Sequence, residues 1–126
     1  MISFDQVGAM LDHIADALPE GFYRELNGGI VLLPEEKLHP ASAGRTDLYI
    51  LGAYHHEPGG LGRYIAIYYG SFIRAHGHLS PSEQEETLRH ILVHEFTHHL
   101  ESLAGERGLE VQDAKDLAKY KEGQNS

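Results

Sequence analysis

Hydrophobic residues in the first part of the chain recur every three or four positions, as they do on one face of a helix. They are Phe4, Val7, Met10, Leu11, Ile14 and Leu18, and the pattern stops at Pro19. Ser3 followed by Gln6 matches a capping box, in which two side chains satisfy backbone N–H groups at a helix start. We therefore predict an amphipathic helix that begins after Ser3.

Three later segments are rich in β-branched and aromatic residues, which favour strands. They are Gly29–Leu33, Asp47–Tyr54 and Arg63–Tyr69. The intervening residues 34–44 and 55–62 contain the proline, glycine and serine that are typical of loops. The pattern predicts three short strands joined by two loops.

The strongest helical pattern begins after Ser80. Ser80 is the expected N-cap, Pro81 takes the first helical position, and Glu83 completes a second capping box. The apolar positions of this helix are Leu88, Ile91, Leu92, Phe96 and Leu103. We expect these residues to face the hydrophobic core.

Two glycines, Gly105 and Gly108, are expected to end this helix. Apolar residues between Leu109 and Ala118 then predict a final helix before a polar tail. The chain has 126 residues, which is enough for one domain with a buried core but leaves no room for a second. The expected architecture is a single α+β domain covering residues 1–126.

The composition excludes several classes of protein. The net charge is −9 and the ten Lys and Arg residues are scattered, so we expect no nucleic-acid partner. No apolar stretch approaches the ~20 residues that a membrane-spanning helix needs, and we expect no membrane association. The first residues lack the pattern of a secretory signal, which leaves a cytoplasmic location as the default expectation.

The chain contains no cysteine, so any metal must be held by nitrogen and oxygen ligands. His94 and His98 are four residues apart on the predicted helix, which places both imidazoles on one face. With Glu95 they form the H-E-x-x-H arrangement, in which two neutral imidazoles bind Zn²⁺ and the glutamate takes a proton from the attacking water. The alternative is a solvated helix face on which the three residues coincide by chance.

Two stretches of sequence also resemble a known family. Residues 64–69 (YIAIYY) and 88–99 (LRHILVHEFTHH) are similar to the mini-zincins, small zinc metallopeptidases. The resemblance implies a minimal zincin-like fold, in which a short twisted sheet packs on the active-site helix and N- and C-terminal helices flank them. It also implies that a peptide substrate lies along the edge strand of the sheet, for which Arg63–Tyr69 is the candidate.

The third metal ligand is not given by the motif. The family pattern continues with a glycine and an aspartate, where this chain has Glu101 and Ala104. On a straight helix with ~1.5 Å of rise per residue, Glu101 lies about 7.5 Å along the axis from the expected ion, and the total gap of about 9 Å exceeds the reach of its side chain. A bend in the helix would bring Glu101 within reach, so it stays among the alternatives. The carboxylates beyond the predicted helix end are Glu106, Glu110 and Asp113. We expect Asp113 to complete the site ahead of Glu110, although each can equally be a solvated helix carboxylate.

Other histidines and tyrosines are weaker candidates. The pairs His55, His56 and His76, His78 can place a ligand or a transition-state donor near the cleft, but loop histidines mostly face solvent. His90 and His99 are expected off the metal-binding face. Tyr54, Tyr68 and Tyr69 can polarise a substrate carbonyl, but tyrosines in strands more often serve packing.

The sequence leaves three functional hypotheses. The first is a zinc-dependent metallopeptidase that hydrolyses peptide bonds of a peptide or protein substrate, with Glu95 as general base. The second is a non-catalytic zinc-binding module that retains the zincin fold. The third is an α+β domain whose histidines bind no metal. The identity of the substrate and the oligomeric state stay open.

Overall fold

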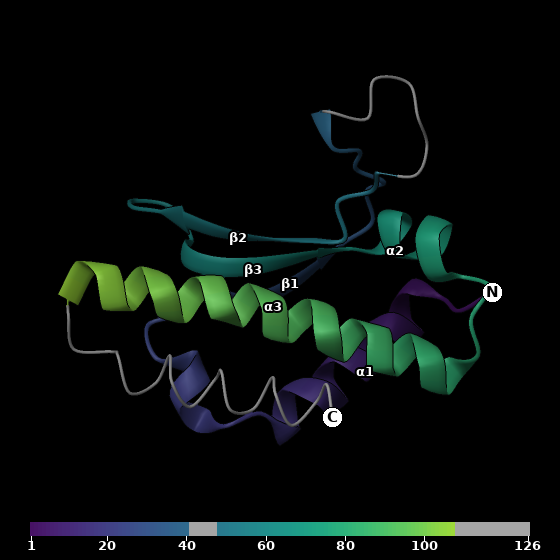
Figure 1. Ribbon diagram of the computed structural model, residues 1–126, viewed down its shortest axis with the longest axis horizontal. Helices are drawn as coiled ribbons and strands as arrows, with labels where there is room; N and C mark the ends of the chain where they lie inside the picture. Colours follow the sequence, from purple (N-terminus) through teal and green to yellow (C-terminus); the bar gives the residue numbers. More distant parts are fainter. Residues whose placement is uncertain (41–47, 108–126) are drawn as a thin grey trace.

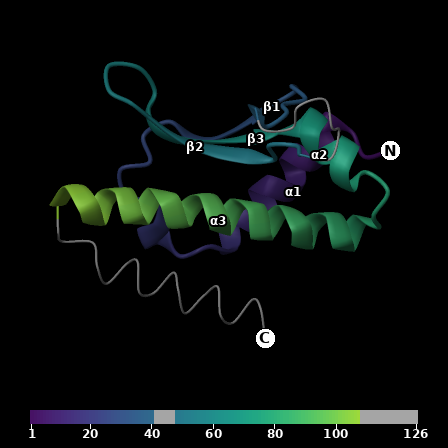
Figure 2. The same cartoon turned by 45° about the horizontal axis from the view of Figure 1, so that its top comes forward.

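The computed structural model describes residues 1–40 and 48–107, and within them it shows a mixed α+β fold. In chain order the elements are α1 (Phe4–Ala17), the short 3₁₀ helix η1 (Glu20–Tyr23), β1 (Gly29–Leu33), β2 (Gly52–Glu57), β3 (Gly62–Tyr68), α2 (Tyr69–His76) and α3 (Pro81–Arg107). Figure 1 shows the long helix α3 running along the small sheet, while α1 crosses α3 at an angle in both views (Figures 1 and 2).

The predicted capping box at the start of α1 is confirmed. The Ser3 hydroxyl accepts a hydrogen bond from the Gln6 backbone N–H at 3.1 Å, and the Gln6 side chain accepts one from the Ser3 backbone N–H at 2.8 Å. The helical spacing then directs Val7, Leu11 and Ile14 into the core, where each is at most 5% exposed. The first helix therefore forms as its local pattern predicts.

The sheet has the strand order β1-β3-β2. β1 pairs parallel to β3, with Gly29 opposite Tyr64, and β2 pairs antiparallel to β3, with Gly52 opposite Ile67. β3 is therefore the central strand, and Ile65 and Ile67 on it are fully buried. The expectation that Arg63–Tyr69 forms the edge of the sheet is wrong, because strands occupy both sides of it.

The second strand begins later than predicted. Residues 48–50 pair with residues 37–39 instead of with the sheet, through a Leu38–Tyr49 bridge and a 2.8 Å hydrogen bond from the His39 backbone N–H to the Leu48 carbonyl oxygen. The sheet strand then runs on through His55 and His56, which the sequence pattern placed in a loop. The cause is tertiary, since the same β-forming segment is divided between two pairing partners.

Helix α2 was not predicted from the sequence, which placed Tyr69 at the end of a strand. The helix has only eight residues and no side-chain cap, so it carries little local signal. It forms because its buried residues Ser71 and Phe72, both 0% exposed, find partners in the fold.

The long helix α3 carries the predicted apolar face. Leu88, Leu92, Phe96 and Leu103 are fully buried and Ile91 is partly buried. The prediction that Gly105 ends the helix is wrong, because α3 continues to Arg107. One glycine in a helix costs only about 1 kcal/mol relative to alanine, which neighbouring helix-forming residues can offset. Gly108 and the predicted final helix lie outside the described residues.

No helix within residues 1–40 and 48–107 combines the length and the apolar character needed to cross a bilayer.

Candidate metal centre

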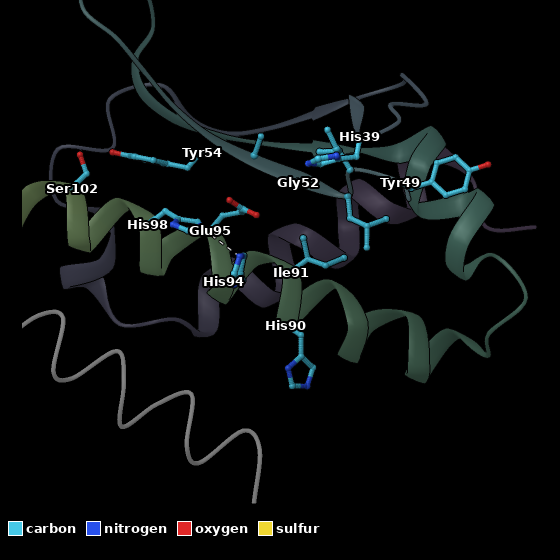
Figure 3. Close-up of a pocket in the computed structure, with 13 residues that line it drawn as sticks. His39, Tyr49, Gly52, Tyr54, His90, Ile91, His94, Glu95, His98 and Ser102 are labelled. Atoms are coloured by element: carbon cyan, nitrogen blue, oxygen red, sulfur yellow. Dashed lines mark hydrogen bonds between the residues drawn. The ribbon is translucent and has the colours of Figure 1, made fainter. Parts of the chain in front are cut away.

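The two histidines of the motif converge on one point in space. His94 and His98 lie one turn apart on α3, their Nε2 atoms are 3.2 Å apart, and their rings are nearly perpendicular, at 88°. Figure 3 shows the two rings next to each other on α3, joined by a dashed line. Their four-residue spacing thus produces the convergence that the sequence predicts.

This separation matches what zinc requires of two imidazole ligands. At a Zn–N distance of about 2.05 Å and a tetrahedral angle, the two nitrogens lie about 3.3 Å apart. Without metal, the same distance lets one imidazole donate a hydrogen bond to the other. The donor set therefore fits two of the ligands of a tetrahedral zinc site.

Glu95 lies beside the two histidines and is largely buried, at 7% exposure. Burial raises the pKa of its carboxyl group above the usual value, and the nearby His98 acts in the opposite direction. Figure 3 shows its carboxylate directed toward the open space between α3 and the sheet. A carboxylate in this position can accept a proton from a water molecule next to the histidines.

The three residues line a cleft between α3 and strand β2, with a volume of about 1090 Å³. Its other lining residues are His39, Tyr49, Ile50, Leu51, Gly52, Ala53, Tyr54, His90, Ile91 and Ser102. Strand β2 is the wall opposite the helix, and it is an edge strand of the sheet. The edge strand that faces the site is thus β2 rather than the predicted Arg63–Tyr69.

The backbone groups of β2 point alternately toward β3 and toward the outer edge of the sheet. The Tyr68 backbone N–H donates to the Leu51 carbonyl oxygen at 3.0 Å, so Leu51 and Ala53 direct their backbone groups toward β3. The backbone groups of Gly52 and Tyr54 consequently point to the free edge. These groups can pair with an extended peptide that lies in the cleft.

Gly52 allows β2 to approach α3 closely. A β-carbon at this position would lie 3.1 Å from Cγ2 of Ile91, 3.2 Å from Cδ1 of Ile67 and 3.3 Å from the Ala66 carbonyl oxygen. Ile91 is one turn before His94 on α3. The absence of a side chain at Gly52 therefore helps to set the distance between the two walls of the cleft.

Behind the cleft, a buried polar network connects α3 to the sheet. His99 Nε2 lies 2.7 Å from the Arg24 carbonyl oxygen. A carbonyl oxygen can only accept, so this nitrogen carries a hydrogen. Burial lowers the pKa of His99, which favours the neutral ring, and its Nδ1 then accepts the proton of the Tyr54 hydroxyl at 2.8 Å. Arg63 Nη1 donates to the Tyr54 oxygen at 2.9 Å and also to the Ser102 hydroxyl.

The third metal ligand is not found in the described part of the chain. Among residues 1–40 and 48–107, no three His, Asp or Glu side chains are grouped so that they can hold one ion. Glu101 is exposed and does not line the cleft. The side chain of Glu106 and the whole of Glu110 and Asp113 lie outside the described residues, so the expected role of Asp113 stays a prediction.

Four of the other histidines considered from the sequence, His55, His56, His76 and His78, do not line the cleft. His55 stacks on Tyr64 with the ring centroids 4.8 Å apart, and His76 is at the end of α2. His99 is fully buried in the network, in agreement with its expected place off the metal-binding face. His90 lines the cleft, but Figure 3 shows its ring projecting away from it.

One cleft histidine was missed by sequence reasoning. His39 lines the cleft from the segment between β1 and β2, and nothing in its immediate sequence signals this. Only the pairing of residues 37–39 with 48–50 brings it there.

The three tyrosines considered as carbonyl donors are engaged elsewhere. Tyr54 lines the cleft, but its hydroxyl proton is directed to His99. The Tyr69 hydroxyl donates to the Ile2 carbonyl oxygen at 2.7 Å, and the Tyr68 hydroxyl accepts from Lys37 Nζ at 3.5 Å. The hydroxyl groups of these tyrosines therefore link separate segments of the fold.

Fold and site together define a small α+β protein with a two-histidine, one-glutamate cleft between a long helix and an edge strand. Its fold is similar to that of a conserved hypothetical protein from Thermus thermophilus, with a TM-score of 0.69. The two chains are 33% identical, and the match covers 82% of this chain and 99% of the Thermus protein. The chain therefore belongs to the same family as that protein. Searches against protein-family models and curated proteins give no match.

Proposed function

We propose that the protein is a zinc-dependent metallopeptidase with a minimal zincin fold. The observation that carries the proposal is the convergence of His94 and His98 to 3.2 Å beside the buried Glu95, inside a cleft. This combination supports metal binding together with proton transfer. A zinc ion held by the two imidazoles would supply Lewis acidity, which acidifies water and polarises a carbonyl group.

The residues of the chain have distinct roles in this proposal. His94 and His98 hold the ion, and the predicted third ligand is Asp113, with Glu110, Glu106 and Glu101 as the alternatives. Glu95 takes the proton of the attacking water and returns it to the leaving amine.

Strand β2 supports a peptide as the substrate class. An extended peptide can add to a sheet edge through backbone hydrogen bonds, and the groups of Gly52 and Tyr54 point to that edge. The scissile bond would then lie between β2 and the helix that carries Glu95.

The alternative is a zinc-binding module without catalysis. It is favoured by one observation, which is that the described residues supply two histidines but no third ligand. A catalytic zinc normally has three protein ligands and one open position.

The test begins with zinc content after dialysis against zinc-containing and then zinc-free buffer. We expect about one zinc ion per wild-type chain, and loss of tight binding in His94→Ala and in His98→Ala. His90→Ala is the matched control, because this histidine is one turn earlier on α3 and its ring projects away from the cleft. Wild-type protein that retains no zinc would refute both the peptidase and the module.

Cleavage of a mixed peptide library, followed by mass spectrometry, separates the two remaining functions. We expect wild-type protein with zinc to cut peptides and Glu95→Gln to keep zinc but lose cleavage. Wild-type protein that holds zinc and cuts no peptide would favour the non-catalytic module.

A further inference from the structure

His39 lies in the cleft on the side opposite helix α3. It is exposed and lines the same cleft as Glu95, His94 and His98. Figure 3 shows its imidazole on the sheet side, beside Gly52, whereas Glu95 extends from α3. A substrate between the two walls would therefore have Glu95 on one side and His39 on the other.

The backbone that carries His39 is firmly anchored. The His39 backbone N–H donates to Leu48, and the neighbouring Lys37 is held from both sides by Ser71 of α2. The Ser71 hydroxyl accepts from the Lys37 backbone N–H at 2.7 Å and donates to the Lys37 carbonyl oxygen at 3.1 Å, and Ser71 is fully buried. The imidazole is thus presented from an ordered support.

Close backbone packing strengthens this anchor. A β-carbon on Gly70 would lie 2.7 Å from the Glu35 carbonyl group and from the Glu36 nitrogen. Helix α2 therefore contacts the segment that leads to His39 without a side chain between them. The backbone that leads to His39 is therefore held in place by α2.

Other hydrogen-bond donors that line the cleft are less suited to contact the reacting group. The Tyr54 proton is directed to His99. In Figure 3 the Tyr49 ring lies at the far end of the cleft from Glu95, and the Tyr49 hydroxyl accepts from Arg74 at 3.4 Å. Ser102 lies beyond His98, at the other end. Among the side chains labelled in Figure 3, His39 is a hydrogen-bond donor on the wall opposite Glu95.

We propose that His39 is a catalytic residue that donates a hydrogen bond to the oxygen of the scissile carbonyl. This inference rests on the proposed peptidase function. As water adds to the carbonyl carbon, the C–O π electron pair moves to the oxygen, and the proton of the water moves to Glu95. His39 stabilises the negative charge on that oxygen without transferring a proton, and an imidazole has at least one N–H donor in either protonation state.

His39 is assigned to the substrate and not to the metal. In the described residues it forms no three-residue group with His94 and His98 that can hold an ion. Its removal should therefore leave the zinc affinity unchanged while weakening the binding of a ligand that resembles the tetrahedral adduct.

The experiment measures binding by calorimetry and uses zinc-loaded wild-type protein, His39→Ala and His39→Gln. One probe is an acetylated phosphinic dialanine analogue, whose tetrahedral phosphorus carries two oxygens like the adduct. The second is acetohydroxamate, a small zinc chelator that does not extend to the opposite wall. His55→Ala is the control, because this histidine is on β2, the strand that forms the wall opposite α3, but it stacks on Tyr64 and does not line the cleft.

We expect His39→Ala to weaken the phosphinic probe about 100-fold, the loss typical for one donor to a developing oxyanion. His39→Gln should regain part of this affinity because its amide can donate. Acetohydroxamate and zinc itself should bind all four proteins equally well.

Two results would overturn the assignment of His39. Unchanged phosphinic affinity in His39→Ala would show that the imidazole does not contact the adduct, and reduced zinc affinity would make it a metal ligand instead. Failure of the proposed peptidase function would give a different result in the wild-type protein itself. It would bind zinc and acetohydroxamate but not the phosphinic probe, or it would bind no zinc at all.

Discussion

The hydroxyl group of Tyr54 donates its proton to Nδ1 of His99 over 2.8 Å, and this bond joins the edge strand of the cleft to the residue that follows His98. It also determines what Tyr54 can do. A hydroxyl whose proton is held by His99, and whose oxygen accepts from Arg63, serves the attachment of α3 to the sheet. It is not available as a donor to a substrate.

Removing this hydroxyl should destabilise the fold. Tyr54→Phe leaves the buried Nδ1 of His99 without its donor and Arg63 without one acceptor, which costs about 1–3 kcal/mol. Urea unfolding in the presence of a chelator measures the free energy of unfolding without a contribution from metal. Tyr64→Phe is the matched control, because its hydroxyl bonds Glu57 at the exposed surface and its loss should cost much less. Equal losses in both variants would contradict the structural role of Tyr54.

Gly52 should not tolerate a side chain. In Gly52→Ala the new methyl group meets Ile91 at 3.1 Å, Ile67 at 3.2 Å and the Ala66 carbonyl oxygen at 3.3 Å. Such overpacking typically costs about 1–3 kcal/mol. Gly8→Ala in α1 is the control, since its β-carbon would lie 3.8 Å from Leu32, in ordinary contact. That change should stabilise the protein by about 0.4–1 kcal/mol.

The same substitution should also alter the cleft. Because a β-carbon at Gly52 would press against Ile91 on the opposite wall, Gly52→Ala should weaken acetohydroxamate binding to zinc-loaded protein, whereas Gly8→Ala should not. Thermal unfolding and calorimetry check the two effects separately. A Gly52→Ala protein as stable as wild type would show that the walls can separate without cost.

The third ligand can be identified by zinc competition with a coloured chelator. If Asp113 completes the site, Asp113→Ala should lower the zinc affinity severalfold or more. The free energy of unfolding of the metal-free variant should stay within about 0.5 kcal/mol of the wild-type value, as for an ordinary surface change. Unchanged affinity in this variant, with a loss in Glu110→Ala, Glu106→Ala or Glu101→Ala, would assign the ligand to that residue instead.

The cap of α3 should make stability depend on acid pH. The Ser80 hydroxyl and backbone N–H donate to the Glu83 carboxylate at 2.8 and 3.1 Å, and they hold its pKa below the usual 4.5. A depressed folded pKa means that the stabilisation is present above the unfolded pKa and is lost as the pH falls through the folded one. As the pH falls below the usual glutamate pKa, the free energy of unfolding should therefore decrease less in Glu83→Gln than in wild type.

Unfolding of wild type and Glu83→Gln across acid pH measures this difference. Asp12→Asn on α1 is a comparison variant. This exposed carboxylate lies in the interior of its helix, whereas Glu83 lies in the first turn and bonds the N-cap residue Ser80. Parallel pH profiles for wild type and Glu83→Gln would show that the cap does not contribute in the charged form.

Much of the local structure follows directly from the sequence. Capping boxes at Ser3 and Ser80 determine two helix starts, because the side chains that bond the free N–H groups lie only three residues away. The convergence of His94 and His98 has a similar origin, since a spacing of four residues places two side chains on the same face of a helix. These features need only short-range geometry.

Other features were decided by tertiary structure. The segment around Tyr49 has strand propensity, but only the folded chain determines that residues 48–50 pair with 37–39 while the sheet strand begins at Gly52. The central position of β3 and the short helix α2 depend in the same way on partners distant in sequence. β-propensity does not specify a partner, so the edge of the sheet could not be assigned from the pattern.

The division is clearest within the cleft. His94, Glu95 and His98 could be identified from five consecutive residues because one helix carries them all. His39 comes from a segment far before this helix in the sequence. The proton of Tyr54 is directed by His99, which is 45 residues further along the chain. Such relationships arise only when distant segments pack together, because side-chain contacts between them have no fixed spacing in the sequence.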